Sequence, residues 1–189
     1  MNEHIHHGCP IVEGTLKDNV SVNHNAYVGP DAVVQGNAYV RDGAHIEGNA
    51  VVDGNAEIHD AATIKGNAVV DGNAEIHDAA TIKGNAVVDG NARVGGNFIV
   101  GGHAHVGGEA SLSGKGSVGG FADINSDDDY VVIQGLTPQP LTVYKSSVWG
   151  FEVSIRGQWE TSIENFLEFE RLPGNVKKII ELIAQKWKK

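Results

Sequence analysis

Residues 48–65 read GNAVVDGNAEIHDAATIK, residues 66–83 repeat these letters without a change, and residues 84–92 begin a third copy. A shorter period of six lies within the eighteen, because every sixth residue is aliphatic and the residue two before it is usually Ala. This aliphatic position recurs without a skipped step from Leu16 to Ile124. From Ala26 onward, the Ala position differs only at Phe98 and Gly116. Such a fixed period indicates a repeat architecture.

The two periods together predict the shape of one coil. Residues two apart on a strand point to the same side, so the Ala and the aliphatic residue of each hexad face inward. The Gly-Asn pair before them suits a corner, because both residues tolerate a positive φ. Three strands and three corners make a triangular coil of eighteen residues. Because a single coil encloses no core, coils must stack as parallel strands, which predicts a mainly β, parallel β-helix of about six coils.

The units GNAYVR (36–41), GNAVVD (48–53) and GNAEIH (54–59) resemble the hexapeptide-repeat family of left-handed parallel β-helices. The resemblance covers residues 10–124. It implies a left-handed coil and a homotrimer with parallel axes.

Composition limits the function classes. The chain has 189 residues and a net charge of −10, of which residues 1–124 contribute −9 through 6 basic and 15 acidic residues. An acidic solenoid repels phosphate, so no nucleic-acid partner is expected. The single cysteine, Cys9, excludes an internal disulfide framework. No signal peptide or membrane-spanning run is visible, so we expect no membrane partner and a cytoplasmic protein.

Two polar features raise the question of a metal site. The N-terminal segment, residues 1–9, contains three histidines and Cys9, but their spacing matches no structural zinc motif. Residues eighteen apart stack, so Asp53, Asp71 and Asp89 form a ladder, for which a solvated face is the expected interpretation. Stacked Asn residues, in contrast, can hydrogen-bond from coil to coil. The sequence therefore predicts no metal ligands.

Several outward residues are candidates for binding or catalysis. Tyr27 and Tyr39 lie between two inward positions, as expected of a subunit interface. His59 stacks on His77, and these two histidines and two tyrosines are the predicted binding residues. No catalytic residue is assigned, but a base for an enzyme would come first from the following outward or corner histidines: His24, His45, His103 and His105.

After Ile124 the period stops, and residues 125–189 predict a C-terminal α+β cap. The segments 129–136, 141–146 and 150–157 alternate as strands do. Thr161-Ser-Ile-Glu164 predicts a capping box that opens a short helix, and a second helix follows Pro173-Gly174. This module would cover the open end of the β-helix. Its TVYKS and VSIRGQW strands resemble the tails of hexapeptide-repeat proteins of phages and prophages.

Two functions follow from these patterns. The first is a non-catalytic trimeric binding or scaffold protein, possessing no cofactor, that binds a protein or small ligand at its faces or inter-subunit grooves. The alternative is the family's CoA-dependent acyltransferase activity, with CoA as cofactor and a histidine as general base. The uninterrupted register leaves no room for the extruded loop that shapes the cleft of many such enzymes, so the first hypothesis is favoured and enzyme status stays open.

Overall fold

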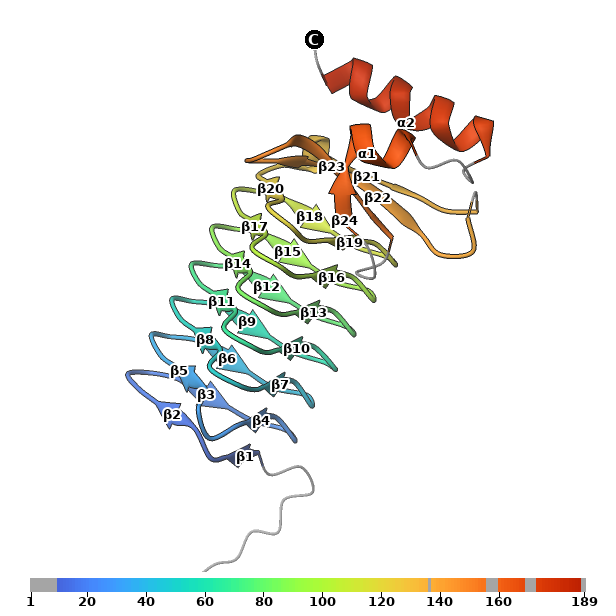
Figure 1. Ribbon diagram of the computed structural model, residues 1–189. Helices are drawn as coiled ribbons and strands as arrows, with labels where there is room; N and C mark the ends of the chain where they lie inside the picture. The colour runs from blue at the N-terminus through green and yellow to red at the C-terminus, as the bar shows by residue number, and fades with distance from the viewer. Residues whose placement is uncertain (1–9, 136, 156–159, 169–172, 188–189) are drawn as a thin grey trace, which may run out of the picture.

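The computed structural model describes residues 10–135, 137–155, 160–168 and 173–187. It is a straight β-solenoid followed by a small module of antiparallel strands and two helices (Figure 1). The predicted N-terminal segment, residues 1–9, lies outside the described residues. No helix in the described ranges is both long and apolar enough to cross a bilayer.

Twenty two-residue strands form three parallel sheets, here called faces A, B and C. Face A consists of β1 (Ile11–Val12), β4 (Tyr27–Val28), β7 (His45–Ile46), β10 (Thr63–Ile64), β13 (Thr81–Ile82), β16 (Ile99–Val100) and β19 (Ser117–Val118). Face B consists of β2 (Thr15–Leu16), β5 (Val33–Val34), β8 (Val51–Val52), β11 (Val69–Val70), β14 (Val87–Val88), β17 (His105–Val106) and β20 (Asp123–Ile124). Face C consists of β3 (Ser21–Val22), β6 (Tyr39–Val40), β9 (Glu57–Ile58), β12 (Glu75–Ile76), β15 (Arg93–Val94) and β18 (Ser111–Leu112). Successive strands belong to successive faces, so each coil is a triangle and the predicted parallel β-helix of about six coils is confirmed.

The core of the solenoid consists of the two inward residues of each hexad. From Ala26 to Ile124 the Ala and the aliphatic residue are almost completely buried on every coil. The second residue of each strand therefore points inward and the first points outward, as the strand period requires. The first coil is open, because Ile11, Val12 and Leu16 are exposed.

Phe98 and Gly116, the two residues that replace the inward Ala, compensate each other in size. Phe98 is fully buried, and Gly116 lies one coil further along in the same position. A Cβ on Gly116 would lie 2.3 Å from Cε2 of Phe98 and 2.8 Å from Cγ2 of Val132. The missing side chain therefore makes the space for the ring, against which Tyr130 packs edge-on with its centroid 5.9 Å away.

The corners repeat with the coils. Gly54, φ +66°, stands directly against the backbone of Gly72 on the next coil, where a Cβ would come within 2.7 Å. Asn side chains form hydrogen-bonded ladders along the corners, such as Asn55 to Asn73 at 3.0 Å and Asn73 to Asn91 at 2.9 Å. The predicted coil-to-coil bonding of Asn is thus confirmed.

The C-terminal module is a four-stranded antiparallel sheet covered by two helices. The sheet consists of β21 (Tyr130–Ile133), β22 (Leu141–Ser146), β23 (Gly150–Ile155) and β24 (Glu160–Ser162), preceded by a 3₁₀ turn η1 (Asp127–Asp129). The helices are α1 (Ile163–Leu167) and α2 (Gly174–Trp187). The predicted helix start was wrong by one residue, because Ser162 caps α1 by accepting from the N–H of Asn165 while Thr161 pairs in β24.

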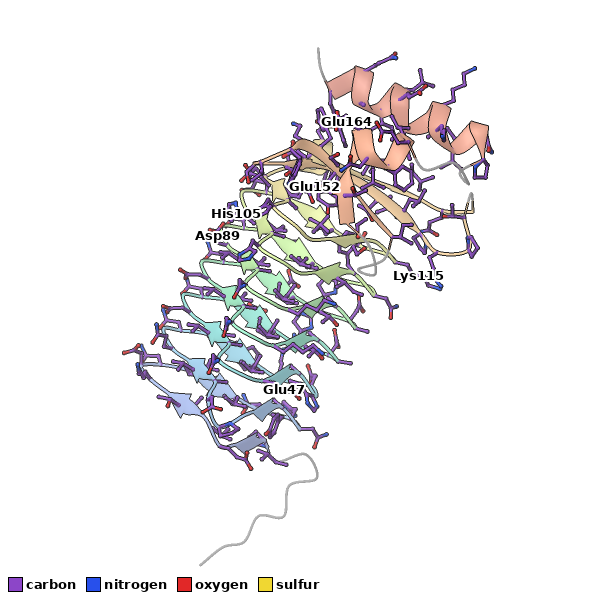
Figure 2. All side chains as sticks on the ribbon, in the orientation of Figure 1. Glu47, Asp89, His105, Lys115, Glu152 and Glu164 are labelled. Carbon is purple, nitrogen blue, oxygen red and sulfur yellow. The ribbon has the colours of Figure 1, made fainter. Side chains whose placement is uncertain are left out.

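The module contacts the last coil through buried polar groups as well as apolar ones. The hydroxyls of Ser117 and Ser154 lie 2.8 Å apart, and the buried Ser117 N–H donates to Thr142 at 3.0 Å. Glu152, labelled at this junction in Figure 2, accepts from the hydroxyl of Ser146 and from the N–H of Phe121. Because buried polar groups are stable only when bonded, this network fixes how the module sits on the solenoid.

Candidate functional site

The first residue of each strand points outward, so each face carries one straight row of side chains. On face B, Val33 pairs with Val51, Val51 with Val69, and Val69 with Val87. All four valines are partly exposed. We call this line of apolar side chains the valine row. Neither of the other faces has such a row among the described residues: face A carries mixed residues, and face C is largely charged in its middle coils.

Acidic side chains follow the valine row along the corner between faces B and C. Asp53 accepts from the Gln35 side chain at 2.6 Å and from the N–H of Gly54 at 2.6 Å. These two hydrogen bonds lower the pKa of Asp53 below its ordinary value. The predicted aspartate ladder therefore exists, but its first carboxylate is neighboured by an amide donor, which reduces the repulsion between like charges.

His105 ends the valine row on face B. Its ring lies between Asp89, whose carboxylate is 3.1 Å from Nε2, and Asp123, 3.4 Å from Nδ1. Figure 2 shows Asp89 and His105 together at the edge of the solenoid. Partial burial of the ring disfavours its charged form, but both carboxylates outweigh this and raise the pKa of His105.

The predicted interface tyrosines lie on different faces. Tyr27 is on face A beside His45, with the ring centroids 5.6 Å apart. Tyr39 is on face C, where the Arg41 guanidinium lies 5.5 Å from its ring centroid. The structure therefore brings Tyr27 and His45 together and leaves Tyr39 apart from them.

His59 and His77 lie at the corner between faces C and A, and their rings stack at 5.6 Å as the register predicts. Each imidazole Nδ1 is close to the aspartate that follows it, at 2.9 Å for Asp60 and 3.0 Å for Asp78. This corner combines imidazole nitrogens and carboxylate oxygens in a small space.

The remaining two histidines are exposed corner residues. His24 has a positive φ of 48°. His103 stacks on Phe121, with ring centroids 5.5 Å apart. A recess beside Phe121, between the last coil and the C-terminal module, is lined by Trp149, Glu152 and Asn165, and none of the histidines that the structure describes lines it. A histidine base in a cleft, which the acyltransferase alternative needs, is therefore not found at this recess.

Sequence reasoning missed the valine row as a binding surface. The sequence contains the pattern that indicates it, since Val occurs at the outward position every eighteen residues from Val33 to Val87. Valine has no polar group, however, and the predicted binding residues were all histidine or tyrosine. It also missed Asp60 and Asp78 as partners of the two stacked histidines, although each aspartate directly follows its histidine.

Comparison with known proteins identifies a family for most of the chain. A family model described as "Putative Ice-binding-like adhesive domain" matches residues 31–168. A crystal structure of a "putative acetyltransferase" from Bacillus cereus matches 94% of this chain and 87% of its own, with 12% identity and a TM-score of 0.29, which supports no statement about activity. No curated protein matches the sequence. The family match spans most of the chain, and the protein therefore belongs to the family of ice-binding-like adhesive domains.

Proposed function

We propose that this protein is a non-catalytic adhesive protein that binds an extended apolar surface through the valine row of face B. The single observation that carries the proposal is the row itself, in which four valines follow one another in register on four successive coils. The adhesive description of the family supports it.

The geometry of face B suits a flat partner. Parallel strands are about 4.8 Å apart, so the row from Val33 to Val87 extends over roughly 14 Å in a straight line. The coils below the side chains are held by backbone hydrogen bonds between neighbouring strands, for example Val51 N–H to the Ala68 carbonyl at 2.9 Å. A rigid surface loses little conformational entropy on binding, so partly exposed valines can contribute their burial energy at each coil.

Adsorption to defined surfaces tests the proposal. The full chain is passed over a methyl-terminated and a hydroxyl-terminated monolayer in a quartz-crystal microbalance. We expect adsorption to the methyl surface that falls several-fold in the Val51→Thr/Val69→Thr variant. Threonine keeps the branched shape that strands favour, so the fold should persist, as circular dichroism would verify.

The matched control removes methyl groups from the neighbouring face. Thr63→Ser and Thr81→Ser change two outward residues of face A at the same spacing of eighteen. Adsorption equal to that of the unchanged protein is expected. If this control reduces adsorption as much as the valine variant does, or if neither monolayer is bound, the adhesive role of face B is refuted.

We also propose, on the hexapeptide-repeat resemblance, a left-handed coil, a phage-related origin of the C-terminal module and a homotrimer with parallel axes. Tyr27 on face A and Tyr39 on face C are on the two faces other than B. Contacts between face A of one copy and face C of the next leave face B outside, and such head-to-tail contacts close into a trimer when neighbouring copies are related by a third of a turn. Native mass spectrometry tests this assembly. If Val69→Asp dissociates the trimer, the valine row is a subunit interface instead, and both this packing and the adhesive role of face B fail.

A further inference from the structure

The corner between faces C and A carries a second group of functional side chains, and it is independent of the valine row. Potential ligand atoms of Asp60, His77 and Asp78 all lie within 4.8 Å of one another. Their side chains are 50%, 32% and 57% exposed, so the group is open to solvent ions. It combines one imidazole nitrogen with two carboxylate oxygens.

The backbone places the two aspartates for this purpose. Asp60 and Asp78 have φ values of 58° and 57° and lie one above the other on successive coils. The N–H of Asp78 donates to Asp60, and the N–H of Gly96 donates to Asp78. Each carboxylate is thereby held at a fixed position at the corner, because one oxygen is tied to the next coil.

His77 is oriented by a missing side chain. A Cβ on Gly95 would lie 2.2 Å from Cε1 and 2.5 Å from Nε2 of the His77 ring. Nδ1 would also lie within 2.8 Å of this Cβ, so the ring occupies the space that Gly95 leaves free, and its Nδ1 is 3.0 Å from the Asp78 carboxylate. The Nδ1 atom is therefore the imidazole nitrogen that lies beside the Asp78 carboxylate.

Charge favours a cation at this set of residues and not at the equivalent set one coil earlier. There the register places Asp42, His59 and Asp60, and the guanidinium of Arg41 forms an ion pair with Asp42. In the later set the register places His59 in the position of Arg41, and its Nδ1 lies 2.9 Å from the Asp60 carboxylate, so no guanidinium forms an ion pair with the first aspartate of this set. The two carboxylates and the imidazole are then left to attract an ion from solution.

We propose that Asp60, His77 and Asp78 bind one divalent transition-metal ion, with water completing its coordination. Two ligands on one such ion are about 3–4 Å apart when each bond is about 2.0–2.2 Å, so small rotations of the exposed carboxylates complete the site. An imidazole ligand selects Co²⁺, Ni²⁺ or Zn²⁺ over Ca²⁺ and Mg²⁺, which take oxygen ligands. The ion would bridge two neighbouring coils.

Isothermal titration of the full chain with CoCl₂ tests this site. All variants carry serine in place of the N-terminal residues His4, His6, His7 and Cys9, because these can bind cobalt by themselves. We expect one equivalent of Co²⁺ to bind this background protein. His77→Gln and Asp60→Asn should each weaken binding at least about tenfold, since both remove a direct ligand.

Asp71→Asn is the matched control, because it removes the same charge at a different corner of the solenoid. Its affinity for Co²⁺ should stay within about twofold of the background, as expected where salt screens distant charges. Equal losses of Co²⁺ affinity in Asp60→Asn and Asp71→Asn would show that the ion is attracted only by the acidic surface in general, and not by a specific site. Binding unchanged by His77→Gln, or no binding at all, would overturn the proposal. Asp78→Asn provides a second ligand variant if His77→Gln fails to fold.

Discussion

Phe98 and Gly116 form a size-complementary pair, and exchanging both for Ala tests whether they act as one unit. Ala occupies the same inward position on the neighbouring hexads, so the backbone at both sites accepts it. The proposed double-mutant cycle compares Phe98→Ala, Gly116→Ala and the double variant. It asks whether one substitution changes the effect of the other on the free energy of unfolding.

The structure gives the expected magnitudes. Phe98 is fully buried, so Phe98→Ala should cost about 3–5 kcal/mol. Gly116→Ala places a Cβ 2.3 Å from the ring, and such overpacking costs roughly 1–3 kcal/mol. In the double variant the clash with the ring is gone and the new methyl fills part of the cavity. The double variant should therefore be about 2 kcal/mol more stable than the sum of the single effects implies.

Urea denaturation measures these differences by far-UV circular dichroism and by tryptophan fluorescence, because all three tryptophans belong to residues 125–189. Coincident transitions of the two probes would justify a two-state analysis. The control pairs Phe98→Ala with Ala44→Gly, which lies three coils away, about 14 Å by strand spacing, and should be additive. Additivity within about 0.5 kcal/mol for the Phe98 and Gly116 pair would refute the proposed compensation.

Three further predictions follow from the repeats. Deleting residues 66–83 keeps the same neighbouring sequence around every remaining residue, so the protein should still fold. Small-angle X-ray scattering should show a solenoid that is about 4.8 Å shorter. An unfolded product would contradict the stacking of interchangeable coils. Because Asp89 and Asp123 raise the pKa of His105, the protonated ring stabilises the fold below about pH 6.5 and this stabilisation is lost as the pH rises through the folded-state pKa. The melting temperature of the His105→Gln variant should therefore depend less on pH between 5.5 and 8.5, and equal pH profiles would disprove the linkage. Asn73→Ala breaks two ladder bonds and should cost about 1 kcal/mol in urea denaturation, and a neutral effect would show that exposed ladders add no stability.

Much of the fold could be predicted because every coil follows the same pattern of inward and outward residues. Inward Ala and aliphatic residues are required on every coil, so a chance pattern could not continue from Leu16 to Ile124 without a break. The C-terminal module gave weaker signals. β24 was missed because Glu160–Ser162 is a short polar segment whose strand conformation depends on pairing with β23.

The candidate sites were harder to predict than the fold. Register alone placed His59 on His77, but it could not show that Gly95 leaves the space for the second ring or that Arg41 pairs with Asp42. Those facts depend on side-chain rotamers and on the shape of the next coil. Both exceptions at the Ala position were visible in the sequence, yet only the structure showed that the Phe98 ring occupies the space above Gly116.

The perfect identity of residues 48–65 and 66–83 has a consequence for folding. During folding, a growing solenoid can add the wrong copy and leave eighteen residues looped out, because the local contacts are equally good in either alignment. Nothing inside the copies distinguishes the two products. The slipped form is opposed by the entropy of closing the loop and by the loss of the burial that one coil contributes, because its inward residues are then exposed. Slow conversion of slipped chains to the native alignment should therefore become a larger part of refolding as further identical copies are inserted.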